Sequence, residues 1–466
     1  MESKEINSKN KMATVPPQKL ILSMGLPVVI SMVMQATYNI VDSIFIARMS
    51  DEAVANAGEL AINALTLAFP IQMLFVAFGI GTGVGVGALI SRKLGEKNIK
   101  IASKAAGNGI FLGLVGFLVF FIFGLFGIDA YLKSQTNDEI IFAYGKTYLT
   151  ICTLLSFGNI LFAIFEKALQ STGKTIYSTI AQLAGAITNI ILDPILIYGL
   201  LGFPKMGVAG AAIATVIGQI VNLILGLYFQ IAKNKELPIK ISDLKPDVTI
   251  IKQIYSIGIS AIIMQALMSF MTYGVNVIFG LVSTNAVSAY GIYYKVQQFI
   301  FFAAFGIRDT ITPVVAFNYG AGLSKRVKQS IKYGVIYTLA IMIIGILILQ
   351  IFAAPLSEAF GLTTHTMDLC IMAMRVCSLG FIFAGINIAL QGVFQALENG
   401  NASLIVSFLR LLVIPLPLAL LFTNFANAES LIWFSFPIAE LAASIVSALL
   451  MKKTSKKVFG KLKKAA

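Results

Sequence analysis

Charged residues are scarce in this chain of 466 residues. They make up 12% of the sequence, whereas about 25% is usual for a soluble domain. Hydrophobic residues make up 58%, and the mean hydropathy is +0.86. This composition excludes a soluble protein of this size, so we expect a polytopic membrane protein.

Cysteine and histidine are also rare. The three cysteines, Cys152, Cys370 and Cys377, are too few and too scattered for a disulfide framework or a zinc site. The only histidine is His365, which excludes a histidine metal cluster and a Ser-His-Asp triad.

The segment Ala168–Thr175 ends in GKT but has alanine where a Walker A loop needs its first glycine. We therefore expect neither an enzyme nor an organic cofactor, and the polar first 19 residues lack the apolar core of a signal peptide.

Long apolar runs dominate the rest of the chain. A helix needs about 20 apolar residues to cross a bilayer, and twelve runs meet that length. The predicted fold class is an all-α polytopic membrane protein with twelve transmembrane helices. The predicted spans are 20–47, 54–90, 103–128, 139–165, 175–200, 207–232, 252–281, 285–317, 329–354, 368–396, 402–424 and 430–451.

The basic residues predict the orientation of these spans. With twelve spans, the Lys and Arg clusters all fall on one side, which is the cytoplasmic side by the positive-inside rule. The opposite loops hold few bases, namely Arg48, Lys133 and Lys205. We therefore expect both termini in the cytoplasm and the protein in the plasma (inner) membrane. The net charge of +14 then reflects topology and contact with membrane lipid, and no nucleic-acid partner is expected.

The chain also contains an internal repeat. Phe305-Gly306-Ile307 lies 227 residues after Phe78-Gly79-Ile80, and Ala396-Leu397 lies 228 residues after Ala168-Leu169. These offsets are close to half the chain, which predicts two six-helix lobes related by a pseudo-two-fold axis. The predicted division is an N-terminal cytoplasmic segment 1–19, an N-lobe 20–232, a cytoplasmic linker 233–251, a C-lobe 252–451 and a basic cytoplasmic tail 452–466.

One carboxylate lies inside the fifth predicted span. Asp193 interrupts the apolar segment Thr188–Gly199, with Asn189 one helical turn earlier and Pro194 directly after it. A charged group at membrane depth costs roughly 2.5–3.5 kcal/mol on insertion scales, so it commonly marks an ion or substrate pathway. Pro194 cannot donate a backbone N–H, which frees the carbonyl group of Ile190.

Two other spans supply polar groups at the same depth. Counting from the outer ends at about 1.5 Å per residue, Asp42, Asp193 and Thr215 all lie roughly 9–12 Å below the outer surface. Oxygen ligands of this kind suit a hard cation such as Na⁺. Alternatively, two close carboxylates in a low dielectric share a proton. A helix-packing role is a third reading, although paired carboxylates suit it poorly.

These residues carry a resemblance to a known family. The chain resembles the bacterial and archaeal branch of the multidrug and toxic compound extrusion (MATE) family over essentially its whole length. The resemblance rests on the aspartate of YNIVDSIFIA, the N-x-x-x-D-P of span five, GVAGAAIAT (Gly207–Thr215) and PVVAFNYGAG (Pro313–Gly322).

The resemblance implies a function and a site. Family members are two-lobed, V-shaped exporters of organic cations that exchange their substrate for Na⁺ or H⁺ by alternating access. The matching positions, which form the cation or proton site of the N-lobe in that family, are here Asp42, Asn189, Asp193 and Thr215. The same four would be the metal ligands if Na⁺ is the coupling ion. Multidrug efflux of small amphiphilic or cationic substrates by a monomer is the expected function.

The C-lobe departs from some members of the family. Those members have acidic residues in spans seven and ten, where this chain has Gln265, Asn387 and Gln391. We therefore place the coupling site in the N-lobe. Arg308-Asp309 is read as a local ion pair. Weaker candidates for the substrate cavity, each with helix packing as its alternative role, are Gln35, Tyr38, Asn39, Gln265, Tyr273 and Lys295.

Two other functions compete with efflux. A lipid-linked oligosaccharide flippase of a related branch needs a cationic cavity for a pyrophosphate, whereas the N-lobe site is acidic. A membrane-embedded enzyme needs a nucleophile with a base, a metal cluster or a cofactor motif, and the sequence shows none. Efflux is therefore the leading hypothesis.

Overall fold

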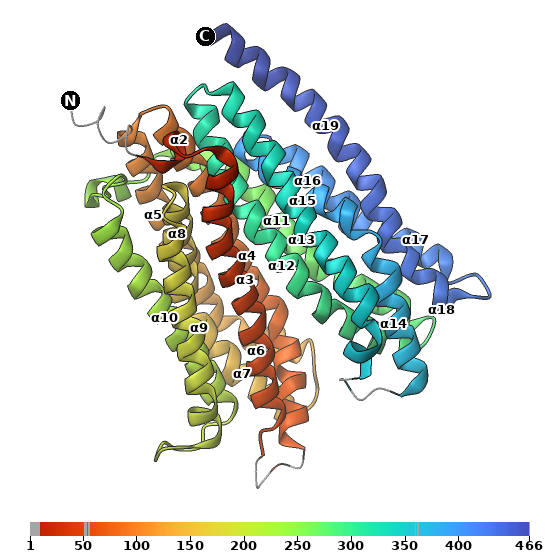
Figure 1. The fold of residues 1–466 in the computed structure, drawn as a ribbon. Coiled ribbons are helices and arrows are strands. Elements are labelled where there is room, and N and C mark those ends of the chain that lie inside the picture. The colour runs from red at the N-terminus through yellow and green to blue at the C-terminus, as the bar shows by residue number, and fades with distance from the viewer. Residues whose placement is uncertain (1–9, 51–53, 55, 359, 361–362, 466) are drawn as a thin grey trace. The chain divides into compact units, whose positions relative to one another are not determined.

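The computed structural model describes residues 10–50, 54, 56–358, 360 and 363–465. In this part of the chain every regular element is a helix (Figure 1). The first nine residues of the predicted N-terminal segment lie outside the described residues, and the helix α2 (Lys11–Thr14) follows them.

The helices follow the order that the repeat predicts. The first half contains α3 (Pro17–Ala47), α4 (Ala57–Gly95), α5 (Ile99–Phe126), α6 (Ile128–Lys133), α7 (Glu139–Leu154), α8 (Phe157–Ser171), α9 (Thr175–Tyr198) and α10 (Val208–Lys233). After η1 (Ile241–Leu244), the second half contains α11 (Val248–Gly280), α12 (Thr284–Gly320), α13 (Ser324–Glu358), α14 (Thr364–Ser378), α15 (Phe381–Ala396), α16 (Gly400–Phe408), η2 (Leu409–Val413), α17 (Pro415–Phe422), α18 (Ala428–Leu431), η3 (Ile432–Phe434) and α19 (Ser435–Ala465).

The described helices confirm the membrane-protein prediction. Ten of them are long and apolar enough to cross a bilayer, and two bent pairs complete the predicted twelve spans. The pair α7–α8 is bent by 45° and the pair α14–α15 by 54°. Each bent pair is the fourth span of its half, so the structure repeats at the interval that the sequence predicts.

The sequence did not predict three details of these spans. The fourth and tenth spans were expected to be single helices. The eleventh contains a π-helical turn, η2, in which the N–H of Ile414 donates to the carbonyl of Leu409 at 3.2 Å. This turn ends at Val413, and α17 then begins at Pro415, whose missing backbone N–H is tolerated at the first position of a helix. In addition, α19 continues as a helix through the basic segment that was assigned to a tail.

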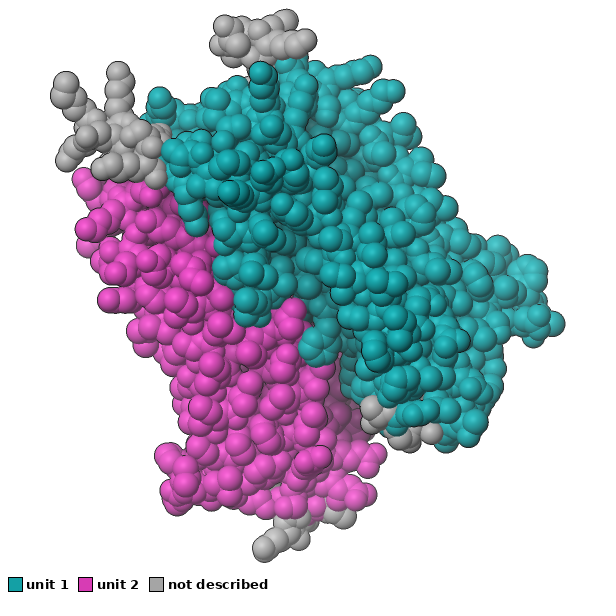
Figure 2. Space-filling model, in the orientation of Figure 1, with its two compact units in different colours: residues 1–32, 91–97, 259–466 teal, residues 33–90, 98–258 magenta. Residues whose placement is uncertain are grey.

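The described chain forms two compact units (Figure 2). Unit 1 contains residues 1–32, 91–97 and 259–466, and unit 2 contains residues 33–90 and 98–258. The boundaries of these units divide α3 after Met32 and α4 after Ile90. They differ from the predicted lobe limits at 232 and 252, and those limits remain a prediction from the repeat.

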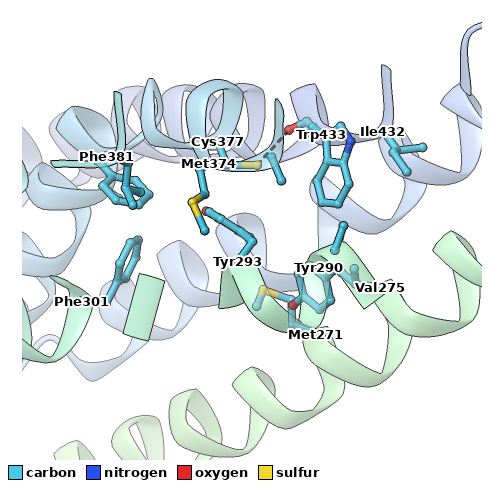
Figure 3. Packing of buried hydrophobic residues seen from close by; sticks show 14 of the residues in the cluster. Met271, Val275, Tyr290, Tyr293, Phe301, Met374, Cys377, Phe381, Ile432 and Trp433 are labelled. Carbon is cyan, nitrogen blue, oxygen red and sulfur yellow. Dashed lines mark hydrogen bonds between the residues drawn. The ribbon is translucent and has the colours of Figure 1, made fainter. Parts of the chain in front are cut away.

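Each unit has its own packed interior. The interior of unit 1 is rich in aromatic side chains, among them Tyr290, Tyr293 and Trp433 (Figure 3). Phe279 makes an edge-to-face contact with Trp433 at a centroid distance of 5.0 Å. In unit 2, Phe75 and Tyr148 belong to the buried cluster. Since lipid is as apolar as these side chains, close packing rather than water exclusion holds such helices together.

Small residues permit the closest approaches between helices. A Cβ atom on Gly320 of α12 would lie 2.2 Å from the carbonyl oxygen of Arg92, and one on Gly95 would lie 2.1 Å from that of Phe317. The ends of α4 and α12 within unit 1 therefore pack backbone to backbone.

We expect Gly320→Ala to destabilise the protein, because the added methyl group overlaps a backbone carbonyl that has little room to move. Overpacking of this kind costs about 1–3 kcal/mol. The matched control is Gly291→Ala in the same helix, because a Cβ there meets no atom within 4 Å. Thermal unfolding of the purified protein in detergent measures both. Equal melting temperatures for the two variants would contradict the packing described.

Candidate functional site

Three helices of unit 2 bring the four predicted site residues together. Asp42 lies on α3, Asn189 and Asp193 on α9, and Thr215 on α10. The amide nitrogen Nδ2 of Asn189 donates to Asp193 Oδ1 at 3.3 Å and to Thr215 Oγ1 at 3.4 Å. The carboxyl groups of Asp42 and Asp193 also lie close enough to interact electrostatically. Asp193 is 0% exposed and Asn189 is 3% exposed, whereas Asp42 and Thr215 are half-buried.

Glycines allow α9 and α10 to approach closely beside the cluster. A Cβ atom on Gly218 would lie 2.7 Å from the carbonyl oxygen of Gly185 and 3.2 Å from the Cβ of Asn189. A side chain at position 218 would therefore push the two helices apart. The spacing set by these glycines places the Asn189 amide within reach of Thr215.

A separate contact fixes α3 against α9. The hydroxyl group of Tyr198 donates to the backbone carbonyl of Phe45 at 2.8 Å. The two rings also meet edge to face, with their centroids 6.3 Å apart. Phe45 lies about one helical turn after Asp42, and Tyr198 lies shortly after Asp193. This contact therefore holds the two carboxyl groups in register.

Several oxygens of the cluster have no partner. Among the described residues, Asp42 Oδ1, Asn189 Oδ1 and Asp193 Oδ2 are buried and accept no hydrogen bond. Buried polar atoms are normally paired, so three orphans in one cluster point to a bound species. Two carboxyl groups this close in an apolar interior can also share one proton. The donor set fits either a proton or a hard cation such as Na⁺, which takes oxygen ligands.

Other groups near Asp42 were missed at the sequence level. Tyr148 and Cys152 of α7 interact electrostatically with Asp42, and both lie beside Gln72 of α4. The Gln72 amide nitrogen donates to the Tyr148 hydroxyl at 3.1 Å. Counting depth from the predicted span ends did not identify these residues. The signal that could have found them is a polar side chain within an apolar span, as in PIQML around Gln72.

The weaker candidates for the substrate cavity differ in location and exposure. Tyr38 lies on α3 within electrostatic reach of both Asp42 and Asp193, and its assignment to the substrate cavity remains a prediction. Gln35 is half-buried on α3, whereas Asn39 is exposed.

The remaining candidates belong to unit 1, apart from the cluster in unit 2. Gln265 is half-buried, whereas Tyr273 and Lys295 are exposed. Arg308 and Asp309 form the predicted local ion pair, with an Nη2–Oδ1 distance of 2.7 Å.

Comparisons with known proteins agree with this fold. The family model MatE matches residues 27–195 and 260–421, which cover both halves of the repeat. The multidrug export protein MepA of Staphylococcus haemolyticus is 27% identical over 93% of both chains. MepA of Staphylococcus aureus strain MSSA476 is 28% identical over 94% of both chains.

Solved structures share the fold. The outward-facing structure of a multidrug resistance MATE family transporter of the MOP superfamily has a TM-score of 0.89, with 23% identity and 98% of both chains covered. A MOP superfamily transporter from Pyrococcus furiosus has a TM-score of 0.88 with 23% identity, and the match covers 96% of this chain and 98% of that one. Since the family model spans most of both halves, the chain belongs to the MatE family, and it is a multi-pass membrane transporter rather than an enzyme.

Proposed function

We propose that this transporter exports organic cations or other amphiphilic drugs in exchange for Na⁺ or H⁺. The observation that carries the proposal is the cluster of Asp42, Asn189, Asp193 and Thr215 with its buried, unpartnered oxygens. The similarity to proteins named multidrug export proteins supports the substrate class. The proposal assigns ion coupling to the half of the chain that contains this cluster.

The coupling follows from electrostatics. In a low dielectric, two close carboxyl groups do not both carry a charge at low cost, so an ion or proton between them stabilises the cluster. Binding of the coupling ion neutralises this charge and weakens the attraction for a cationic substrate. Asp42 is the principal carrier in this proposal, because α3 brings it to the partners on α9 and α10. In this proposal, ion binding changes the contacts that α3 makes with α9 and α10, and this change drives alternating access.

We expect Asp42→Asn to abolish ion-driven efflux, because an amide neither releases a proton nor supplies a charged ligand. The measurement is ethidium efflux from proteoliposomes with an imposed Na⁺ gradient or an imposed pH gradient. The wild type should respond to one of the two gradients, which identifies the coupling ion. The efflux rate of the variant should fall by at least about tenfold, which corresponds to about 1.4 kcal/mol of free energy.

Asp138→Asn is the matched control for this experiment. Asp138 is an exposed N-cap of α7 in the same unit, and asparagine caps a helix equally well. Normal gradient-driven efflux by Asp42→Asn would refute the coupling role. No response of the wild type to either gradient would refute the antiport proposal and favour the flippase.

We expect Tyr198→Phe to lower the apparent affinity for the coupling ion, because it removes the hydrogen bond to Phe45 and keeps the ring contact. A lost hydrogen bond is worth about 1 kcal/mol, which corresponds to roughly a fivefold change in affinity. The readout is the Na⁺ concentration or pH that gives half-maximal efflux. Tyr177→Phe is the control on the same helix, since it packs on Phe229. A half-maximal point identical to that of the wild type would show that this contact does not position the carboxyl pair.

We also propose that the protein resides in the plasma (inner) membrane with both termini in the cytoplasm. The three native cysteines are buried, so an introduced exposed cysteine can report the topology. We expect an impermeant maleimide to label Ser134→Cys in intact cells and Ser242→Cys only after permeabilisation. Both positions are exposed, and they lie in connections between spans that the proposed topology places on opposite sides of the membrane. Labelling of Ser242→Cys in intact cells would reverse the proposed orientation.

A further inference from the structure

Unit 1 contains a cavity of its own, far along the chain from the carboxylate cluster. Its volume is about 60 Å³, which has room for roughly four water molecules at about 15 Å³ each. Both arginines of two buried ion pairs line it, together with phenylalanine, tyrosine and methionine side chains. None of Gln265, Tyr273 and Lys295 is among the lining residues.

Two ion pairs contribute the charged side chains of the lining, namely Arg308, Arg410 and Glu440. Arg308 binds Asp309, and Arg410 binds Glu440, with its Nη2 atom 2.6 Å from Glu440 Oε1. Asn387 donates to Glu440 Oε2 at 2.8 Å. Arg308 is 7% exposed and Arg410 is 6% exposed. Burial of a charged guanidinium group in an apolar interior costs free energy, so two such groups at one cavity indicate a function.

Both guanidinium groups retain capacity for a ligand. A guanidinium has five N–H donors, and the ion pairs use the Nε and Nη2 atoms of Arg308 and Arg410. Arg410 lies on the π-helical turn η2, a distortion that is frequent at functional sites.

A third polar group points to a ligand independently. Gln391, which also lines the cavity, is 0% exposed. Its Nε2 atom donates to Ser407 at 2.9 Å, whereas its Oε1 atom is buried without a partner among the described residues. A buried, unpaired amide oxygen is costly unless a bound group satisfies it.

The apolar part of the lining is aromatic and adaptable. Phe301 and Phe381 meet edge to face with centroids 5.1 Å apart (Figure 3). Arg308 lies over the ring of Phe305 at 4.7 Å from its centroid. Three methionines, Met264, Met268 and Met271, form another part of the wall, and their flexible side chains can move to admit a ring.

We propose that this cavity is a second small-molecule site, which binds aromatic compounds that carry a carboxylate. The carboxylate contacts the free N–H edges of Arg308 and Arg410, because planar guanidinium groups bind carboxylates in a paired geometry. The ring packs among the phenylalanines, and a hydroxyl or amino substituent donates to Gln391 Oε1. The proposed site prefers an anionic ligand, whereas the Asp42 cluster is proposed to bind a cation. The proposal of this second site does not rest on ion coupling at that cluster.

The only tryptophan of the chain provides the assay. Trp433 accepts a hydrogen bond at its carbonyl group from Cys377, and both Cys377 and Phe436 line the cavity. Bromine quenches tryptophan fluorescence at short range, so a brominated ligand in the cavity should quench Trp433. The probes are 4-bromobenzoate, 4-bromobenzyl alcohol and 4-bromobenzylamine, which share one ring and differ in charge, and 8-bromooctanoate, which has a carboxylate without a ring.

We expect saturable quenching of the full-length protein by 4-bromobenzoate, at least tenfold tighter than by the other three probes. Two charge-neutral double variants, Arg410→Gln/Glu440→Gln and Arg308→Gln/Asp309→Asn, should each weaken this binding at least tenfold. An unchanged emission maximum of Trp433 shows that the variants fold. Arg375→Gln, at an exposed position of α14, should bind normally.

Three results would overturn the proposal. They are equal quenching by all the aromatic probes, equal quenching by 8-bromooctanoate, or unchanged binding in both double variants. If one double variant does not fold, the other variant and the comparison of probes decide the question. Asp42→Asn should bind 4-bromobenzoate normally, so loss of ion-driven efflux and loss of this binding are distinguishable.

Discussion

The contact between the carboxyl groups of Asp42 and Asp193 inside an apolar helix bundle is the interaction on which the rest of the site depends. Each charge at this depth costs roughly 2.5–3.5 kcal/mol, and their mutual repulsion adds to that cost. The chain lowers this cost with the Asn189 amide, which donates to Asp193 and Thr215. It leaves three oxygens of the cluster unpaired. Unpaired oxygens in a carboxylate cluster are better explained by a ligand that binds reversibly than by helix packing.

The surrounding fold serves to hold this pair in register. Gly185 and Gly218 set the distance between α9 and α10, and the hydroxyl group of Tyr198 fixes α3 through Phe45. The two halves of the chain share an order of helices but not a chemistry. Unit 2 buries a carboxyl pair, whereas unit 1 buries two arginine–carboxylate pairs beside an aromatic cavity. The two halves therefore bury different polar groups.

The sequence predicted the helical class, the number of spans and the four members of the cluster, because long apolar runs and rare carboxylates are strong signals. It did not predict the bends of the fourth and tenth spans or the π-helical turn that carries Arg410. These depend on local packing, such as the contact of Gly380 with Pro437. It also missed Gln72 and Tyr148 near Asp42, since a tilted helix need not place its residues at the depth that simple counting gives. The pairing of Arg410 with Glu440 joins residues 30 positions apart and requires the fold.

The central claim is that the Asp42–Asp193 pair binds the coupling ion itself. The most direct measurement is equilibrium binding of radioactive Na⁺ to the purified protein, with proton uptake and release followed in the same samples by a pH indicator. The account predicts that the wild type binds Na⁺ or exchanges a proton near neutral pH and that Asp42→Asn/Asp193→Asn does neither. Undiminished ion binding by that double variant would contradict the account and would place the coupling ion elsewhere.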